Sequence, residues 1–361
     1  MKIGIVTFHD AKNYGAALQA YALCKFINNN LQNVDAEIVD YKCKYLDAFY
    51  DPSLAFGNSI KGRIKRFLAK TTLTKRNSVF YEFVKHNIPL STRYDENNIN
   101  SAQSYDAYIA GSDMLWHWHT DSNGEHFDNT YFLDFVKENS KKNSYAASFG
   151  TESIDSKYEE HYKSMLKDFN NISVREESGI VFVEKFTGKK ALCHVDPTLL
   201  FTMQEWRKIE KKPQKDSYIL LYEVGSISDR MLSYAKKLAN EKGKELIILL
   251  SEYDPIKSKG IFGYSPQEFL GWFDNADYVI TNSFHGTVFS ILYHKQFLVE
   301  INSWIKNNRS SELMEKLNLS DRTLDLGTDI DFTIVWDMVD AKLNVLRDNA
   351  EKYLNKIAFG E

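Results

Sequence analysis

The chain has 361 residues, of which 43% are hydrophobic, 14% aromatic and 26% charged. This length exceeds what one hydrophobic core usually serves, so we expect two domains. The 45 lysines and arginines against 49 aspartates and glutamates give a net charge of −4. This balance lacks the basic excess that binding to a phosphate backbone requires, and it argues against nucleic acid as a partner.

Membrane spans, secretion and disulfides are not indicated either. Uninterrupted apolar runs such as 246–250 are far shorter than the roughly 20 residues that cross a bilayer. The apolar N-terminal stretch meets His9 and Asp10 too early for a secretory signal, so we expect a cytoplasmic protein. The three cysteines are odd in number and far apart, which favours neither a disulfide framework nor a thiolate metal site.

The first half of the chain has an α/β pattern. An apolar, β-branched run over 2–8 predicts a strand, and helical spacing from Ala16 predicts the helix after it. A strand over 36–41 follows at the distance expected of a parallel βαβ unit. Further strands are predicted at 105–110 and 143–149, each ending at a glycine.

The segment 60–83 is rich in lysine and arginine and carries apolar residues, including Ile64, Phe67 and Leu68, at helical spacing. Its pattern favours a solvated helix face. A helix lying on a membrane surface is the alternative, so peripheral contact with the inner face of a membrane remains open.

A second βαβ series begins after residue 200. Strands are predicted at 218–222, 245–250 and 278–281, with helices over 229–240 and from Ser265. We place one domain at 1–200, a second at 201–330 and an amphipathic C-terminal helix within 331–361.

The turn inside 277–290 is the sharpest candidate site. A buried strand runs directly into a helix, with Ser283, His285 and Gly286 at the junction. Ligands of open parallel sheets bind at this end of a strand, where the free amides of a helix N-terminus suit a phosphate or a carboxylate. Equally compatible is a plain cap by Ser283 beside a structural histidine.

Asn13 and Tyr14 occupy the equivalent position after the first strand, in the small-residue segment 10–17. Small residues allow close backbone approach to a ligand. The segment lacks the G-x-G-x-x-G and Walker patterns, so a dinucleotide or P-loop site is not supported. A plain strand-to-helix turn is the alternative.

The segment 111–119 places a carboxylate, Asp113, and two tryptophans, Trp116 and Trp118, beyond a strand end. Tryptophan faces stack on sugar rings, and an aspartate can hold or deprotonate a hydroxyl. A metal site is a weaker alternative, and its ligands would be His117, His119, Asp121 and His126.

Arg175 is the last candidate, an arginine at a strand end before an acidic helix start. On position alone it is more typical of a structural ion pair than of a ligand site.

Taken in this order, these segments resemble the polysaccharide pyruvyl transferase family. The matching pieces cover most of the chain and are Ile5–Leu23, Ala110–Trp116, Ser144–Gly150, Val174–Gly179, Asp196–Leu200 and Asp277–Gly286. The resemblance implies two Rossmann-like domains that face a cleft, as in GT-B glycosyltransferases.

The resemblance also implies phosphoenolpyruvate as donor, a sugar or lipid-linked oligosaccharide as acceptor, and a cyclic pyruvate ketal as product. No cofactor or metal is implied. In the family an arginine and a histidine bind the donor, and they correspond to Arg175 and His285. Ser283 and Gly286 would complete the donor turn, with His285 and Asp113 as catalytic groups. Asn13, Tyr14, Trp116 and Trp118 would bind the acceptor.

One departure concerns charge. Many family members have arginine two places before the histidine, where this chain has Ser283. Another cation must then neutralise the donor, and Arg309 is the first candidate, in a polar loop after a strand predicted at 296–301. Arg322 is the second. The alternatives to pyruvyl transfer are a GT-B glycosyltransferase that uses a nucleotide sugar, and a binding protein without activity.

Overall fold

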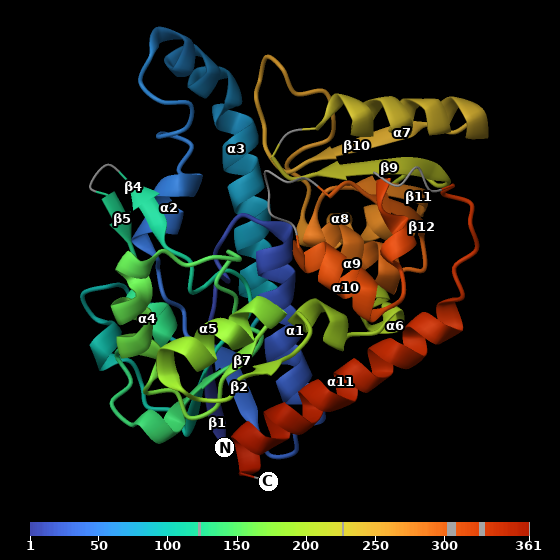
Figure 1. The fold of residues 1–361 in the computed structure, drawn as a ribbon. Helices are drawn as coiled ribbons and strands as arrows, with labels where there is room; N and C mark the ends of the chain where they lie inside the picture. Colours follow the sequence, from blue (N-terminus) through green and yellow to red (C-terminus); the bar gives the residue numbers. More distant parts are fainter. Residues whose placement is uncertain (122–123, 226, 302–307, 325–328, 361) are drawn as a thin grey trace.

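The computed structural model describes residues 1–121, 124–225, 227–301, 308–324 and 329–360. Its core is formed by two separate parallel sheets, one from each half of the chain (Figure 1). The first sheet has the order β2-β1-β3-β6 and the second the order β10-β9-β11-β12. Their strands are β1 (Lys2–Val6), β2 (Asp35–Ile38), β3 (Ala107–Ala110), β6 (Lys142–Ser144), β9 (Tyr218–Glu223), β10 (Leu246–Leu250), β11 (Ala276–Thr281) and β12 (Gln296–Val299).

Short pairs of strands extend the first half. β7 (Ser173–Val174) and β8 (Leu192–Cys193) pair in parallel, and a bridge between Ala147 and Val174 links them to the chain that leaves β6. β4 (His119–Asp121) and β5 (Gly124–His126) form an antiparallel hairpin.

Helices connect and cover these sheets. They are α1 (Tyr14–Asn30), α2 (Lys44–Tyr50), α3 (Ile60–Asn87), α4 (Glu159–Leu166), α5 (Glu177–Thr187), α6 (Met203–Arg207), α7 (Asp229–Lys242), α8 (Pro266–Asp274), α9 (Phe284–Leu292), α10 (Asn308–Lys316) and α11 (Trp336–Phe359). Local chemistry sets several of their starts. Asn13 caps α1 by accepting from the amide of Ala16, and Ser265 forms a capping box with Glu268 at α8.

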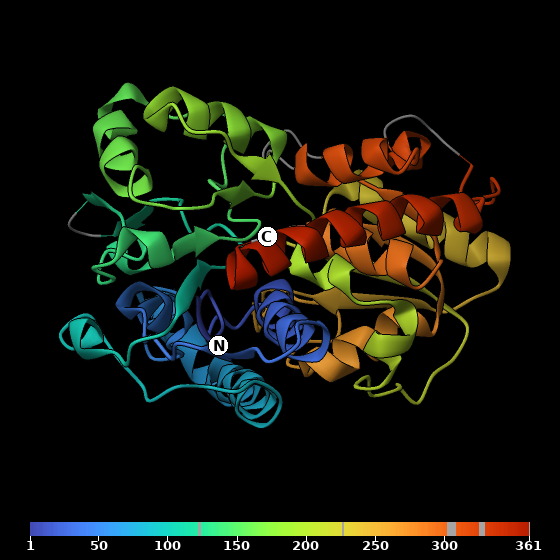
Figure 2. The same ribbon diagram turned by 90° about the horizontal axis from the view of Figure 1, so that it is seen from below.

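One apolar core runs through both domains. Tyr14 of α1 stacks on Tyr264, with ring centroids 4.4 Å apart, and donates its hydroxyl to the Tyr264 carbonyl oxygen. α11 crosses both domains on the underside of the molecule (Figure 2). Its Trp336 stacks on His294 of the second domain, and its Tyr353 donates to the carbonyl oxygen of Ser144 in the first. The two domains are therefore joined by packing as well as by the chain.

The predicted fold class is confirmed: the chain is α/β, with two Rossmann-like domains and a C-terminal helix. The boundary predicted at residue 200 falls at the end of a 3-10 turn, Pro197–Leu200, between the two sheets. The strand predicted over 143–149 is shorter than expected, because only 142–144 pair continuously with β3.

Candidate functional site

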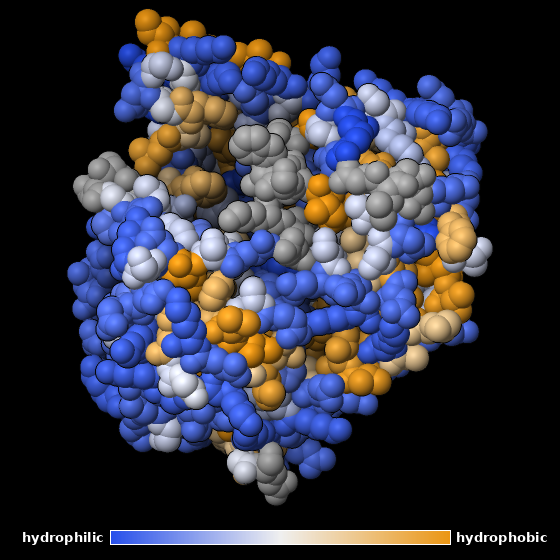
Figure 3. Space-filling model, in the orientation of Figure 1, coloured by the Kyte–Doolittle hydropathy of each residue, from blue (hydrophilic) through white to orange (hydrophobic). Residues whose placement is uncertain are grey.

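A cavity of about 330 Å³ lies between the two domains. Its walls come from the segments that follow β1, β3, β9 and β11, together with α2 and the first turn of α10. In both sheets these are the strands where the order reverses direction, and ligands of doubly wound sheets bind at this position. The surface is hollowed between the α2–α3 region and the second domain (Figure 3).

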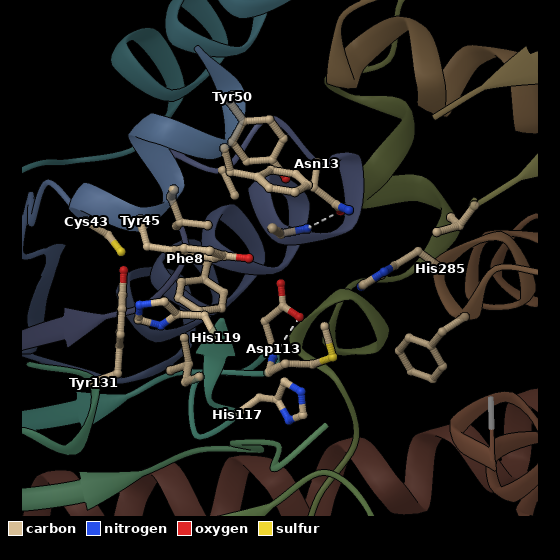
Figure 4. Close-up of a pocket in the computed structure, with 18 of the residues that line it drawn as sticks. Phe8, Asn13, Cys43, Tyr45, Tyr50, Asp113, His117, His119, Tyr131 and His285 are labelled. Carbon is tan, nitrogen blue, oxygen red and sulfur yellow. Dashed lines mark hydrogen bonds between the residues drawn. The ribbon is translucent and has the colours of Figure 1, made fainter. Parts of the chain in front are cut away.

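His285 enters the cavity from the second domain, and Asp113 and Asn13 approach it from the first (Figure 4). The Ser283 hydroxyl caps α9 by accepting from the Gly286 amide, which places His285 in the first turn. A Cβ atom on Gly15 would lie 1.9 Å from His285 Nδ1, so the imidazole fits only because position 15 has no side chain.

Asp196 lies behind His285 and is fully buried. Its Oδ1 is 3.7 Å from His285 Nε2, and its Oδ2 accepts from Arg175 Nη1 at 3.0 Å and from the Ser112 hydroxyl at 3.1 Å. Burial alone would raise the pKa of Asp196. The neighbouring His285 and Arg175 instead hold this pKa far below its usual range. Asp196 is therefore an ionised carboxylate whose charge lies directly behind the His285 imidazole.

Two arginines flank the ring of Phe284. The guanidinium carbon lies 5.2 Å from the ring centre for Arg175 and 5.8 Å for Arg309. Both border a smaller cavity of about 40 Å³, but only Arg309 also lines the large one. Arg175 thus lies behind the cavity wall, where Glu176 and Asp196 hold it, and its buried Nη2 has no hydrogen-bond partner among the described residues.

Arg309 makes no hydrogen bond or ion pair with any described residue, and its guanidinium lies over the Phe284 ring. Burial and the like charge of Arg175 lower the pKa of Arg309. An anion placed beside this guanidinium would stabilise its charged form and so offset the lowering of its pKa. Arg309 lies in the first turn of α10 rather than in the predicted loop, and 302–307 of that loop lie outside the described residues.

Three helix N-termini border the cavity: those of α1, α9 and α10. The first turns of all three contain no acidic residue. Their positive partial charges are therefore not neutralised by the helices' own side chains, and they favour an anionic ligand.

Asp113 has a left-handed backbone, with φ of 80°. This conformation costs free energy in a residue with a side chain, and such strain is concentrated at functional sites. Its carboxylate accepts from the Met114 amide at 2.8 Å. Nearby, burial lowers the pKa of His117, whose Nδ1 is 2.9 Å from the Phe149 carbonyl oxygen, so this histidine is neutral at pH 7.

Aromatic side chains form the rest of the wall on the first-domain side. They include Phe8, Tyr45, Phe49, Tyr50, Trp118 and Tyr131. Rings of this kind offer faces for stacking against a sugar.

Two predicted acceptor residues do not line this cavity. Trp116 is fully buried among Phe132, Phe149 and Phe169, and its indole N–H donates to the Tyr131 carbonyl oxygen. Tyr14 is buried in the interface between the domains, as described above. Neither lines the cavity, whereas Asn13 and Trp118 do.

Two residues predicted for the donor side also lie elsewhere. Gly286 packs against Thr281, whose Oγ1 would be 2.2 Å from a Cβ atom at that position, so it does not line the cavity. Arg322 is fully buried and donates to the carbonyl oxygens of Ile330 and Phe332, so it is unavailable as the replacement cation. Ser283 does line the cavity.

The alternative metal site is not assembled by the described residues. Among them, no group of three histidine, cysteine or acidic side chains is placed to hold an ion. The side chain of Asp121, one of the four predicted ligands, lies outside the described part of the chain.

The sequence matches the family model for polysaccharide pyruvyl transferase over residues 13–303. The chain belongs to this family. No significant match was found among curated proteins.

Solved structures show the fold of this pyruvyl transferase family member. UDP-GlcNAc 2-epimerase from Neisseria meningitidis, bound to UDP-GlcNAc, aligns over all of both chains with 10% identity and a TM-score of 0.50. The epimerase from Methanocaldococcus jannaschii (12% identity, 99% of this chain and 100% of that one) has a TM-score of 0.48. The heptosyltransferase WaaC from E. coli (11% identity, 84% and 89%) has a TM-score of 0.38. The fold is GT-B-like.

Sequence reasoning missed several residues of the family member's site. Gly15 was included only as one of several small residues, and Asp196 has the sequence signature of an ordinary cap before Pro197. The cluster of tyrosines and Phe49 between 41 and 50 was the available signal for α2, whose aromatic rings line the cavity.

Proposed function

We propose that this protein transfers the pyruvyl group of phosphoenolpyruvate to two hydroxyls of a sugar in a polysaccharide or its precursor. The product is a cyclic ketal, and phosphate is released. The observation that carries this proposal is the polarity of one cavity. Its second-domain side has His285, Arg309 and the N-termini of α9 and α10, and its first-domain side has the N-terminus of α1, aromatic rings and Asp113.

The second-domain side of the cavity suits the donor, which carries a phosphate and a carboxylate. Arg309 would contact these groups directly, as the cation that compensates for serine at position 283. Arg175, which borders the small adjoining cavity, would act from behind Phe284, with its Nε and Nη1 donating to Glu176 and Asp196. This division of roles keeps both arginines on the donor side, as the sequence analysis expects, and gives the direct contact to Arg309.

The reaction needs one acid and one base. A proton added to the methylene carbon makes the adjacent carbon cationic, and one sugar hydroxyl attacks that carbon and loses its proton. The carbon–oxygen bond to phosphate then breaks, and the second hydroxyl attacks the same carbon, closing the ring as its proton leaves. Of the two hydroxyl protons, one restores the acid that protonated the methylene carbon, and the other leaves with phosphate.

His285 is our candidate for the acid, because its imidazole enters the cavity and the ionised carboxylate of Asp196 lies 3.7 Å from its Nε2. Asp113 is our candidate for the base or for positioning of the acceptor hydroxyls, and its carboxylate faces the same space (Figure 4). Asn13 and Trp118 would hold the sugar. This chemistry itself calls for neither a metal nor a nucleotide.

The deciding experiment incubates the protein with phosphoenolpyruvate and a panel of hexosides. It measures phosphate release together with the mass gain of a pyruvyl ketal. The His285→Gln variant should lose about two to four orders of magnitude in kcat. His86→Gln, at an exposed position on α3, is the matched control. Turnover of a UDP- or GDP-sugar instead would support the glycosyltransferase alternative, and no turnover with any donor would support a binding protein.

A further inference from the structure

The residues 52–70, which we call the basic tip, comprise the segment after α2 and the first turns of α3. They project beyond the rest of the molecule at the top of Figure 1. Apolar and hydrophilic surfaces lie side by side at this end (Figure 3). The backbone here is held in place, because Arg66 donates to the carbonyl oxygens of Ala55 and Gly57.

The basic tip exposes a stripe of large apolar side chains. Ile60, Ile64, Phe67 and Leu68 are 80%, 54%, 82% and 53% exposed. Their spacing of four, seven and eight residues from the first places them on one face of α3. The opposite face, with Ala69 buried, packs toward the protein. A folded protein gains nothing from presenting such a stripe to water.

Positive charge borders this stripe on both sides. Between residues 52 and 81 the sequence has seven lysines and arginines and no acidic residue, although the whole chain has a net charge of −4. At about 100° per residue, Lys61 lies on one side of the stripe and Arg63 and Lys70 lie on the other. These three side chains form no hydrogen bond or ion pair with the described residues, whereas Lys65 pairs with Asp254.

The basic tip is directly continuous with the aromatic wall of the cavity. Phe49 and Tyr50, which line the cavity, end the helix that precedes the tip. Further along α3, the Asn77 amide donates to the Tyr50 carbonyl oxygen at 2.9 Å, and the guanidinium of Arg76 lies over the Tyr50 ring. A surface that covers the tip therefore lies close to the aromatic wall of the cavity.

We propose that the basic tip docks on an anionic lipid bilayer, with the apolar stripe in the boundary between headgroups and acyl chains. An apolar face bordered by lysine and arginine is the pattern of helices that lie in this boundary, and the negative surface potential attracts the three free cations. Attachment is at the surface only, since no helix among the described residues combines the length and apolar character needed to span a bilayer. A role for this attachment in presenting a lipid-linked acceptor rests on the proposed function, whereas the docking itself does not.

The test measures binding to vesicles by flotation, with no substrate present. Vesicles of mixed phosphatidylglycerol and phosphatidylcholine should bind the protein, and vesicles of pure phosphatidylcholine should bind it far more weakly. High salt should weaken the binding to anionic vesicles, because it screens exposed charges.

Variants separate the two components of the surface. Lys61→Glu, Arg63→Glu and Lys70→Glu together should lower vesicle affinity by more than about a hundredfold, since each cation contributes about fivefold. Ile64→Ser with Phe67→Ser should lower it by about tenfold or more. The matched controls are Lys211→Glu with Lys212→Glu, and Val345→Ser with Met338→Ser, which change exposed residues elsewhere and should leave the affinity unchanged.

Two results would overturn the proposal. The first is absence of binding to anionic vesicles, or equal binding by the tip variants and the wild type. The second is self-association in sedimentation velocity that the same variants abolish, which would assign the tip to a second copy of the chain. Thermal melts establish that the variants fold. Ketal formation on a soluble sugar, which the tip variants should retain, tests the proposed function separately.

Discussion

At the scale of single residues, the two arginines beside Phe284 differ in what holds their charge. Arg175 is fixed by two carboxylates, whereas Arg309 borders the cavity without an acidic partner among the described residues. The charge of Arg175 is thus balanced within the protein, and the charge of Arg309 is available to a ligand.

Replacing Arg309 by alanine should raise the KM for phosphoenolpyruvate by about tenfold to a hundredfold, the range expected for a charge-assisted hydrogen bond. The KM for the acceptor should stay close to the wild-type value. Steady-state kinetics of Arg309→Ala and Arg309→Lys check this, with the surface variant Arg207→Ala as the control. An unchanged donor KM in Arg309→Ala would eliminate the residue from the donor site.

Glu223 lies at the end of β9, between two residues of the cavity wall, and is almost fully buried. Burial raises the pKa of Glu223 to about 8, with a smaller contribution from Glu252, and its Oε2 has no partner among the described residues. In the unfolded chain the same carboxyl has a pKa near 4.5. Between these values the folded protein binds the proton and the unfolded chain does not, so stability falls as pH rises through this window.

Glu223→Gln removes that proton and should therefore flatten the fall in Tm between about pH 5 and about pH 9. Differential scanning calorimetry across this range measures the effect. Glu252→Gln, which removes only the neighbouring charge, should show a smaller change in the same direction. Parallel pH profiles for the wild type and Glu223→Gln would contradict the assignment.

At the scale of elements, the first turn of α1 supports the site from the opposite domain. Gly15→Ala would place a methyl group where the His285 imidazole lies. Alanine favours a helix over glycine by about 1 kcal/mol, whereas fitting its methyl group against the imidazole costs about 1–3 kcal/mol, so stability should fall by no more than about 2 kcal/mol. Displacement of His285, the proposed acid, should nevertheless lower kcat/KM by about a hundredfold. A variant with normal activity would show that the imidazole reacts from another position.

The sequence alone was sufficient to predict those strands and helices that have a strong local pattern. Continuous apolar runs identified β1, β9, β10 and β11, and the junction at Ser283 and His285 was placed correctly at a strand's carboxyl end. The sequence did not predict the burial of Trp116, because this burial depends on Phe149 and Phe169, which are far away in sequence. Local patterns carry no information on which distant side chains will cover a residue.

At the scale of the whole molecule, α11 ties the two domains together, and the apolar core continues from one domain into the other. Pattern analysis predicted this helix from its amphipathic spacing. It could not predict that the helix crosses both domains, because that position depends on residues from each of them.

Leu354→Ala should lower the free energy of unfolding by about 2–5 kcal/mol, because Leu354 is fully buried and its truncation leaves a cavity. Urea denaturation followed by tryptophan fluorescence and circular dichroism should show one transition, shifted to lower urea, by both probes. Val345→Ala, at an exposed position on the same helix, should change stability by less than about 0.5 kcal/mol. Two separate transitions, with only one of them shifted, would show that the domains unfold independently.

The three helix N-termini that we propose attract the donor would also attract the phosphate that it leaves behind. They recognise charge through amides rather than shape, and with Arg309 they would hold inorganic phosphate after the sugar has departed. Phosphate should then inhibit competitively with phosphoenolpyruvate, and sulfate should act in the same way. Phosphate that accumulates during an assay would then slow turnover, and an enzyme system that consumes free phosphate should keep the rate at its initial value.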